Sequence, residues 1–203
     1  MTRERLAWLK AGVIVTALVP LVLLVARAFG LGDLGANPVQ EVLHTLGKTG
    51  LNPLLISLAV TPLRRLTGLN WLVGLRRALG LLAFAYALLH ALTYAVLDWR
   101  LDLSTLLADI TERPFITIGF LAVVLLIPLA VTSTNAMQRR LGRRWRTLHR
   151  AVYVIAMLGV VHFFWQTKLD TSEASLYAAI LAVLLGFRLA DWSRKQIRQQ
   201  LRQ

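Results

Sequence analysis

Two apolar stretches decide the fold, RRALGLLAFAYALLHALTY at residues 76–94 and LHRAVYVIAMLGVVHFFW at residues 148–165. Each stretch has arginine near its start. Deep within the uncharged run that follows, each has a single histidine, His90 in the first and His162 in the second. An ionisable side chain at bilayer depth costs roughly 2.5 kcal/mol or more unless it is neutral and partnered, so it is a candidate functional residue. Neutral imidazole is the most common metal ligand, and paired histidines on facing helices hold low-spin haem. These stretches therefore indicate electron transfer.

The composition around these stretches argues against a soluble protein. Of the 203 residues, 57% are hydrophobic and 16% are charged, and the mean hydropathy is +0.61. A soluble core of this size cannot bury so much apolar surface, which predicts a multi-span membrane protein. The net charge of +13 does not indicate nucleic-acid binding, because the basic residues cluster between apolar runs. The sequence contains no cysteine, which excludes thiol redox chemistry and iron–sulfur clusters within this chain.

Windows of about 20 residues predict an all-α bundle of six transmembrane helices, at 8–29, 47–66, 77–97, 115–134, 148–166 and 174–192. The second is the weakest, since its strictly apolar part is short and contains Pro53 and Pro62. A polar segment from Asn37 through His44 to Lys48 is expected to precede it at the membrane interface. No internal repeat and no second domain is evident, so residues 1–203 are expected to form a single domain.

The distribution of charge supports the second span and orients the bundle. With six spans and the N-terminus inside, only five of the 23 basic residues fall outside: Arg27, Lys48, Arg100, Arg113 and Lys168. Without the second span, the two arginine-rich loops would lie opposite the N-terminus, against the positive-inside rule. Of the 10 acidic residues, only Glu4 and Asp191 fall inside. We therefore expect cytoplasmic termini, a basic inner face and an acidic outer face.

Helix geometry predicts that His90 and His162 lie at one depth. Each follows the inner end of its helix, at Arg77 or His149, by about 13 residues, which corresponds to roughly 20 Å. A porphyrin with axial imidazoles from these two helices would fit this arrangement. His149 cannot ligate the same iron, because a metal–nitrogen bond is only about 2 Å long. It could serve a second haem or another cofactor near the inner face.

Each histidine also has a purely structural interpretation. His90 or His162 alone could hydrogen-bond to a carbonyl of a neighbouring helix. His149 lies beside Arg146 and Arg150, where a solvated histidine is ordinary, and His44 is expected to be exposed at the interface. The arginine clusters are first of all determinants of topology, and only secondarily a site for haem propionates, a flavin phosphate or acidic lipid.

Beyond single residues, the sequence resembles a known family. The stretches NPVQEVLHTLGKTGLNPLLISLAVTPLRR (37–65) and RPFITIGFLAVVLLIPLAVTSTNAMQRRLGRRW (113–145), with the two stretches that open this section, are similar to the MsrQ family, formerly YedZ. Its members are haem-binding membrane subunits of the bacterial periplasmic methionine sulfoxide reductase system, with a ferric-reductase-like transmembrane domain. The similarity extends from Asn37 to about Lys168 with little interruption.

The resemblance implies cofactors, partners and a location. It implies b-type haem held by His90, His149 and His162, with FMN as a further cofactor, in a multi-pass protein of the bacterial inner membrane. Electrons would come from the respiratory quinone pool or an inner-side flavin reductase. They would pass to a periplasmic molybdopterin-containing catalytic subunit that reduces methionine sulfoxide in oxidised proteins. This chain would then be the electron-transfer subunit, and the reduction of methionine sulfoxide would occur on the partner.

One departure from the related oxidases leaves the inner site open. Those oxidases carry a second histidine near the inner end of the third helix, where this chain has Arg76 and Arg77. Either a second haem there has an unusual ligand beside His149, or flavin or quinone occupies the region of Arg76 and Arg77. Two other functions also remain: a stand-alone ferric or quinone reductase, and a non-redox membrane scaffold or small transporter in which the histidines merely join helices.

Overall fold

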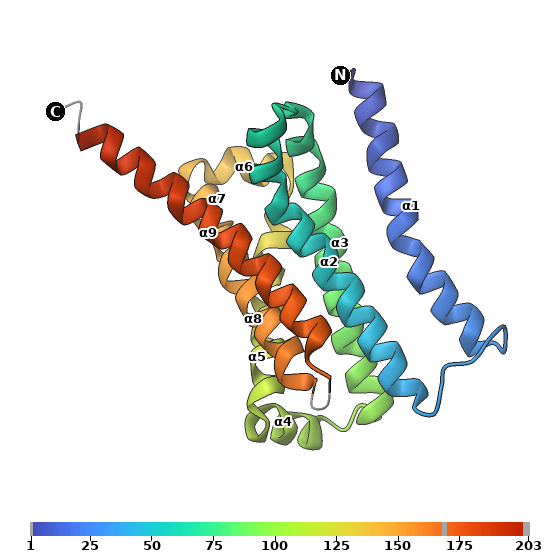
Figure 1. The fold of residues 1–203 in the computed structure, drawn as a ribbon. Helices are drawn as coiled ribbons and strands as arrows, with labels where there is room; N and C mark the ends of the chain where they lie inside the picture. The colour runs from blue at the N-terminus through green and yellow to red at the C-terminus, as the bar shows by residue number, and fades with distance from the viewer. Residues whose placement is uncertain (1, 168–169, 201–203) are drawn as a thin grey trace.

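The computed structural model describes residues 2–167 and 170–200, and within them every regular element is helical. The turns η1 (Asn70–Leu75) and η2 (Tyr94–Asp98) precede and follow α3, and Figure 1 shows the long helices running side by side in alternating directions. We call the end of the bundle crossed by α4 the α4 end, and the opposite end the α6 end. The helices are α1 (Arg3–Ala28), α2 (Pro38–Thr67), α3 (Arg76–Thr93), α4 (Leu103–Glu112), α5 (Pro114–Val131), α6 (Asn135–Leu141), α7 (Arg143–Leu148), α8 (Ala151–Gln166) and α9 (Ser172–Gln200).

Helical stretches long and apolar enough to cross a membrane establish a multi-pass membrane protein. They are Glu4–Ala28, Asn70–Asp98, Pro114–Val131, Arg143–Gln166 and Ser172–Gln200. Their outward surface is apolar, and Val15, Leu92 and Val183 are all more than half exposed, as expected where lipid replaces water. The five stretches contain or overlap five of the six spans expected from the sequence. The remaining expected span, 47–66, lies inside α2, which is not among them.

The second helix begins earlier than the span expected at 47–66. Residues 38–48 continue directly into that span, because α2 is a single helix of 30 residues. Asn37 caps it by accepting a hydrogen bond from the backbone N–H of Gln40 at 3.2 Å. Pro38 occupies the first turn, where the missing N–H of a proline costs nothing. Sequence hydropathy missed this continuity because the first half of α2 is polar.

Polar side chains of α2 are paired with α9, which explains the low hydropathy of α2. Lys48 Nζ donates to Glu173 Oε2 at 3.2 Å, and the hydroxyl of Tyr177 donates to Asn52 Oδ1 at 2.6 Å. Arg65 forms an ion pair with Asp191 near the other end. In a bundle surrounded by lipid, polar groups are retained where another helix satisfies them. Average hydropathy therefore underestimates how deeply such a helix is buried.

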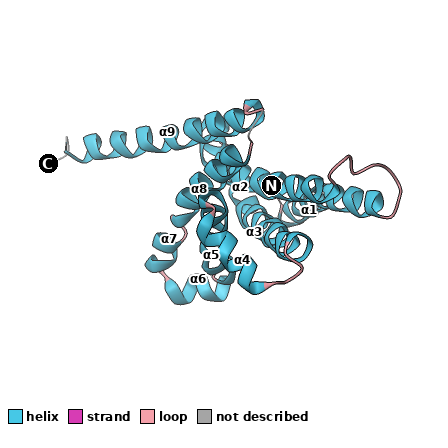
Figure 2. Ribbon diagram, turned by 90° about the horizontal axis from the view of Figure 1, so that it is seen from below, coloured by secondary structure: helices cyan, strands magenta, loops and turns pink. Residues whose placement is uncertain are grey.

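The core lies where the antiparallel pairs α2–α3 and α5–α8 meet. Leu54, Leu58, Ala83, Leu126 and Ile155 belong to one cluster of buried side chains. Figure 2, which looks from below the view of Figure 1, shows α1 and the C-terminal half of α9 extending away from this core on different sides.

A glycine sets the distance between α2 and α3. A Cβ atom at Gly50 would lie 3.2 Å from the Cβ of Tyr86 and 3.3 Å from the backbone nitrogen of Ala87. Tyr86 is buried, and its hydroxyl donates to the backbone carbonyl of Ala17 in α1. The close approach at Gly50 therefore also positions the contact with α1.

A short amphipathic helix closes the α4 end. Asp102 caps α4 by accepting hydrogen bonds from Ser104 and Thr105, and these bonds lower the pKa of Asp102 from its usual value to about 2. Its carboxylate is therefore charged at any physiological pH. Asp109, on the buried face of α4, accepts from the hydroxyl of Tyr94 and pairs with Arg113 Nε at 2.6 Å. These contacts fasten α4 to the ends of α3 and α5.

We expect Gly50→Leu to destabilise the bundle by about 1–3 kcal/mol, the usual cost of overpacking a closely packed contact. The added side chain would push α3 away from α2. The matched control is Gly80→Leu on α3, because a Cβ atom at Gly80 meets nothing within 4 Å. Thermal unfolding of the detergent-solubilised variants measures the difference. Equal loss of stability in the two variants would contradict this account of the α2–α3 contact.

Candidate functional site

The structure brings His90 and His162 together inside the bundle. His90 lies near the C-terminal end of α3, and His162 lies one turn before the end of α8, so both are closer to the α4 end. Their ring centroids are 6.2 Å apart and the ring planes cross at 79°. Two histidines separated by more than seventy residues in the sequence thus face each other across the core.

Each of these rings is held by a backbone carbonyl of a neighbouring helix. His90 Nδ1 lies 3.0 Å from the carbonyl oxygen of Leu43 in α2, and His162 Nδ1 lies 2.7 Å from that of Phe115 in α5. A carbonyl can only accept, so both Nδ1 atoms carry the hydrogen and both Nε2 atoms keep a lone pair. Metal-ligating histidines commonly donate their other N–H to such a carbonyl.

The separation of the two rings suits a metal between them. Two metal–nitrogen bonds of about 2 Å, with roughly 1.1 Å from each nitrogen to its ring centre, require centroids roughly 6 Å apart. The observed separation is 6.2 Å. A purely structural pair of histidines would need the carbonyl bonds but would not need the two rings to lie at this separation.

The same local construction holds both rings, although the sequence showed no repeat. In each case the carbonyl belongs to the residue 47 positions before the histidine. In each case a glycine one helical turn after that carbonyl, Gly47 or Gly119, packs against the ring. A Cβ atom would lie 3.5 Å from His90 Nδ1 at Gly47 and 2.7 Å from His162 Nδ1 at Gly119. The antiparallel pair α2–α3 and the antiparallel pair α5–α8 therefore present histidine in one common way.

His149 lies apart from this pair, at the junction between α7 and α8. Its ring stacks on Trp145 with centroids 4.0 Å apart, and its Nε2 lies 3.0 Å from the hydroxyl oxygen of Thr132. That hydroxyl donates to the carbonyl of Pro128 at 2.6 Å, so it accepts from His149 Nε2. The nitrogen that stays free at His90 and His162 is thus engaged at His149.

The fourth histidine is more buried than the sequence suggested. His44 is half-buried rather than exposed, and its Nε2 is a buried atom with no hydrogen-bond partner in the described part of the chain. It lies near enough to His90 for an electrostatic interaction between the two rings. A buried nitrogen without a partner normally costs free energy, so it is a position where another group is expected.

Arg76 and Arg77, at the start of α3, differ in burial and in hydrogen-bond partner. Arg76 is half-buried and donates to the hydroxyl of Thr61 in α2. Arg77 is exposed and donates to Asn135 Oδ1 at 2.9 Å. From the sequence we predicted that both arginines belong to one flavin or quinone region. In the structure only the side chain of Arg76 extends into the bundle.

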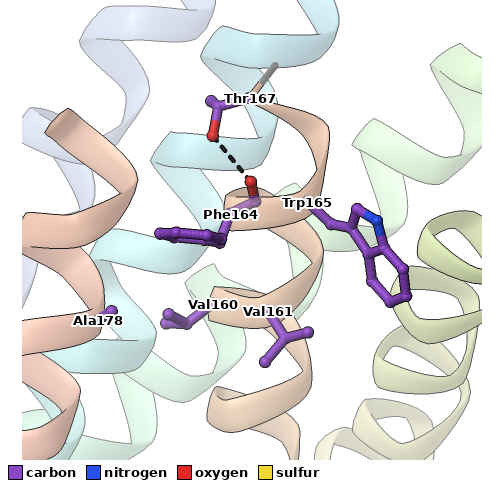
Figure 3. A pocket seen from close by; sticks show the side chains of 6 residues that line it. All are labelled: Val160, Val161, Phe164, Trp165, Thr167 and Ala178. Atoms are coloured by element: carbon purple, nitrogen blue, oxygen red, sulfur yellow. Dashed lines mark hydrogen bonds between the residues drawn. The ribbon is translucent and has the colours of Figure 1, made fainter. Parts of the chain in front are cut away.

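A groove opens along α8, on the side that faces Ala178 of α9. Its volume is about 620 Å³ and its walls are mainly apolar. As Figure 3 shows, side chains from successive turns of α8 line it with one residue of α9, and the hydroxyl of Thr167 donates to the carbonyl of Phe164 at 2.9 Å. The lining residues are Val160, Val161, Phe164, Trp165, Thr167 and Ala178.

Sequence reasoning missed the residues that position the histidines. Gly47 and Gly119 had no visible role, although a glycine inside a transmembrane helix is a signal of close helix packing. The carbonyls of Leu43 and Phe115 left no signal, because every residue has one. Arg188 on α9 was counted only toward topology, yet it contacts Tyr153, Thr61 and Leu58.

Comparison with known proteins places the chain in a family. The model of the ferric reductase like transmembrane component family matches residues 11–160. A protein from Ralstonia nicotianae is 54% identical over 85% of this chain and 81% of its own length. One from Bordetella pertussis is 46% identical over 97% and 96%, and one from Azospira oryzae is 45% identical over 94% and 82%.

All three relatives carry the same name, protein-methionine-sulfoxide reductase heme-binding subunit MsrQ. The family model covers well over half of the chain, and the relatives align along most of both sequences. The chain belongs to the ferric reductase-like transmembrane family and, within it, to the MsrQ proteins.

Proposed function

We propose that this chain carries electrons across the membrane through a b-type haem ligated by His90 and His162, and delivers them to a methionine sulfoxide reductase. The observation that carries the proposal is the pair of facing imidazoles, 6.2 Å apart, each with its Nδ1 bound to a carbonyl and its Nε2 free. The names of the MsrQ relatives, which describe heme-binding subunits, point to the same cofactor.

The residues present fit a haem better than a bare metal ion. Within residues 2–167 and 170–200, no group of three or more histidine, cysteine, aspartate or glutamate side chains could hold a metal ion. Two imidazoles therefore suit a metal whose other ligands come from a macrocycle. The unpartnered Nε2 of His44 is a further place where a polar group of such a cofactor would be stabilised.

The protein's own contribution is to hold the ligands still. The carbonyls of Leu43 and Phe115 fix the tautomer of each ring and increase the basicity of the opposite nitrogen. Gly47 and Gly119 give each ring room against a neighbouring helix. A haem held by His90 and His162 would supply a one-electron carrier, and ligation by both imidazoles would favour outer-sphere transfer over oxygen activation.

We also propose that α2 is the sixth membrane span. A helix of 30 residues is about 45 Å long, which exceeds the hydrocarbon core of a bilayer, and α2 lies antiparallel beside α3 (Figure 1). Six spans place both termini and the arginine-rich α6 end in the cytoplasm, in accordance with the positive-inside rule. Residues 1–203 then form one transmembrane haem domain of the inner membrane, with the α4 end outside.

The direction of electron flow follows from this orientation. Respiratory quinol or a flavin reductase would donate electrons, and FMN would serve as a further cofactor near the basic inner end around Arg76, Arg77 and His149. The periplasmic molybdopterin subunit would dock on the acidic outer segments, residues 98–113 and 167–173, where Asp102 stays charged. Lys168, in the second of these segments, lies outside the described residues.

We expect His90→Ala and His162→Ala each to abolish haem binding, because one imidazole cannot hold a six-coordinate low-spin iron. His149→Ala should retain most of the haem, since His149 is engaged by Thr132 and Trp145 away from the pair. Absorbance of the reduced Soret band and a haem and flavin count on purified protein measure this. Full loss of haem in His149→Ala alone, or an unchanged spectrum in the other two variants, would disprove the assignment.

We expect Gly119→Ala to weaken haem binding about 10-fold or more, the usual effect of disturbing the outer shell of a metal ligand. The new methyl group would lie 2.7 Å from His162 Nδ1 and must displace the ring or break its bond to Phe115. Gly47→Ala is the matched control, because its methyl group would lie at an ordinary 3.5 Å from the His90 ring. Haem titration of the two apo-proteins should separate them, and equal affinities would contradict the proposed geometry.

We expect the reduced haem to be oxidised rapidly by the molybdopterin partner and slowly by chelated ferric iron. Stopped-flow absorbance of the purified protein measures both rates. The rate with the partner should fall as salt concentration rises, because the outer face is acidic and ion-pair steering is screened. Faster oxidation by chelated iron would favour a stand-alone ferric reductase, and a protein without reducible haem would favour a scaffold.

A further inference from the structure

Two arginines from different helices donate to a single threonine near the α6 end. The guanidinium of Arg76 in α3 donates to the hydroxyl of Thr61 in α2. Arg188 in α9 reaches the same hydroxyl with Nη1 at 3.4 Å, and that nitrogen also donates to the hydroxyl of Tyr153 in α8 at 3.0 Å. Arg188 Nη2 donates to the carbonyl of Leu58 at 2.6 Å. Two arginines thus meet inside the bundle around one neutral acceptor.

Neither of these two arginines forms an ion pair within the described part of the chain. The ion pairs found there are Arg27–Glu41, Lys48–Glu173, Arg65–Asp191 and Arg113–Asp109, and they include neither Arg76 nor Arg188. Both arginines are half-buried. Arg64 and Arg188 also act on Arg76 as like charges. Charged groups in a membrane bundle are normally paired, so a counter-charge is expected at this position.

The guanidinium of Arg188 is held in a fixed plane, and one of its donors has no acceptor among the described residues. The Arg188 guanidinium lies over the Tyr153 ring, 4.8 Å from its centroid, which fixes the plane of the fork. Its Nε is buried and has no hydrogen-bond partner among the described residues. Planar guanidinium forks recognise phosphate through paired N–H donors, and they do so more strongly when held in place.

We propose that Arg76 and Arg188, with Thr61 and Tyr153, form an anion site that takes a phosphate ester. The ester could belong to the headgroup of an anionic phospholipid of the inner leaflet or to a soluble phosphate compound such as FMN, and the FMN case rests on the FMN placement proposed above. In either case the phosphate supplies the counter-charge that the described residues do not. The site uses none of the proposed haem ligands, so this proposal and the haem proposal can fail separately.

The alternative is that the arginines only join α9 to α2 and α8. In that case the contacts of Arg188 with Leu58, Thr61 and Tyr153 are complete without a ligand. Removing a guanidinium would then lower stability equally in the presence and absence of phosphate compounds. The two explanations therefore differ in ligand dependence and not in the stability of the variants alone.

The test uses the full-length protein as purified, with the cofactors it retains, delipidated in a neutral detergent. Phosphatidylglycerol, phosphatidylcholine, inorganic phosphate and FMN are added separately, and binding is measured by native mass spectrometry and by the ligand-induced shift in unfolding temperature. The variants are Arg76→Gln, Arg188→Gln, Arg188→Lys and Tyr153→Phe. Arg139→Gln is the matched control, because Arg139 is an exposed arginine of α6 that loses the same charge outside the site.

We expect at least one phosphate compound to bind wild type and Arg139→Gln with equal affinity. The same compound should bind Arg76→Gln and Arg188→Gln with affinity lower by about tenfold or more. Arg188→Lys should fall between, since it keeps the charge and loses the fork. Preference for phosphatidylglycerol over phosphatidylcholine would identify a lipid, whereas binding of FMN or phosphate alone would identify a soluble ligand.

Two results would overturn the proposal. One is binding that is equal in wild type and in the site variants, or absent from wild type for every probe. The other is an equal loss of binding in Arg139→Gln, which would mean that only the general positive charge of this end attracts anions. If Arg188→Gln does not fold, Arg76→Gln and Tyr153→Phe decide the outcome, because each removes one donor or one support from the site.

Discussion

The arrangement of this bundle depends on two hydrogen bonds from histidine to backbone carbonyls in an apolar interior. Leu43 and Phe115 supply carbonyls that accept from His90 and His162 at 3.0 and 2.7 Å. In a helix a carbonyl already accepts from its own chain, but it has a second lone pair that can serve a neighbouring helix. Because few competing partners exist at this depth, each bond settles the tautomer, the rotation of the ring and the direction of the free nitrogen.

Those hydrogen bonds require helices that approach closely, and glycines of α2 and α5 allow this approach. Gly47 and Gly119 admit the rings, and Gly50 allows the backbones of α2 and α3 to lie near each other. In a membrane, close packing and satisfied polar groups hold helices together, because lipid gives apolar side chains no reason to leave it. The close packing at the glycines and the hydrogen bonds of the histidines therefore depend on each other.

The two ends of the bundle use related positions for different chemistry. Toward the α4 end, α3 and α8 each present a histidine with a free nitrogen. Toward the α6 end, Thr61 of α2 accepts from Arg76, and Thr132 of α5 accepts from His149. Only the first arrangement leaves two ring nitrogens without a hydrogen-bond partner among the described residues, beside the proposed haem. The second concentrates donors and positive charge, which suits the anion that we propose there.

Sequence alone determined the membrane class, the meeting of His90 with His162 and the separate position of His149, because helical rise and apolar length are local properties that periodicity records. The tertiary structure decided what depends on neighbours. It made α2 one long helix whose polar residues pair with α9, and it left His44 half-buried. It also placed Arg76 in the bundle and Arg77 at the surface, and it brought Arg188 into contact with Thr61 and Tyr153. No sequence pattern records which carbonyl or hydroxyl of a distant helix a side chain will reach, since that is settled only when the helices pack.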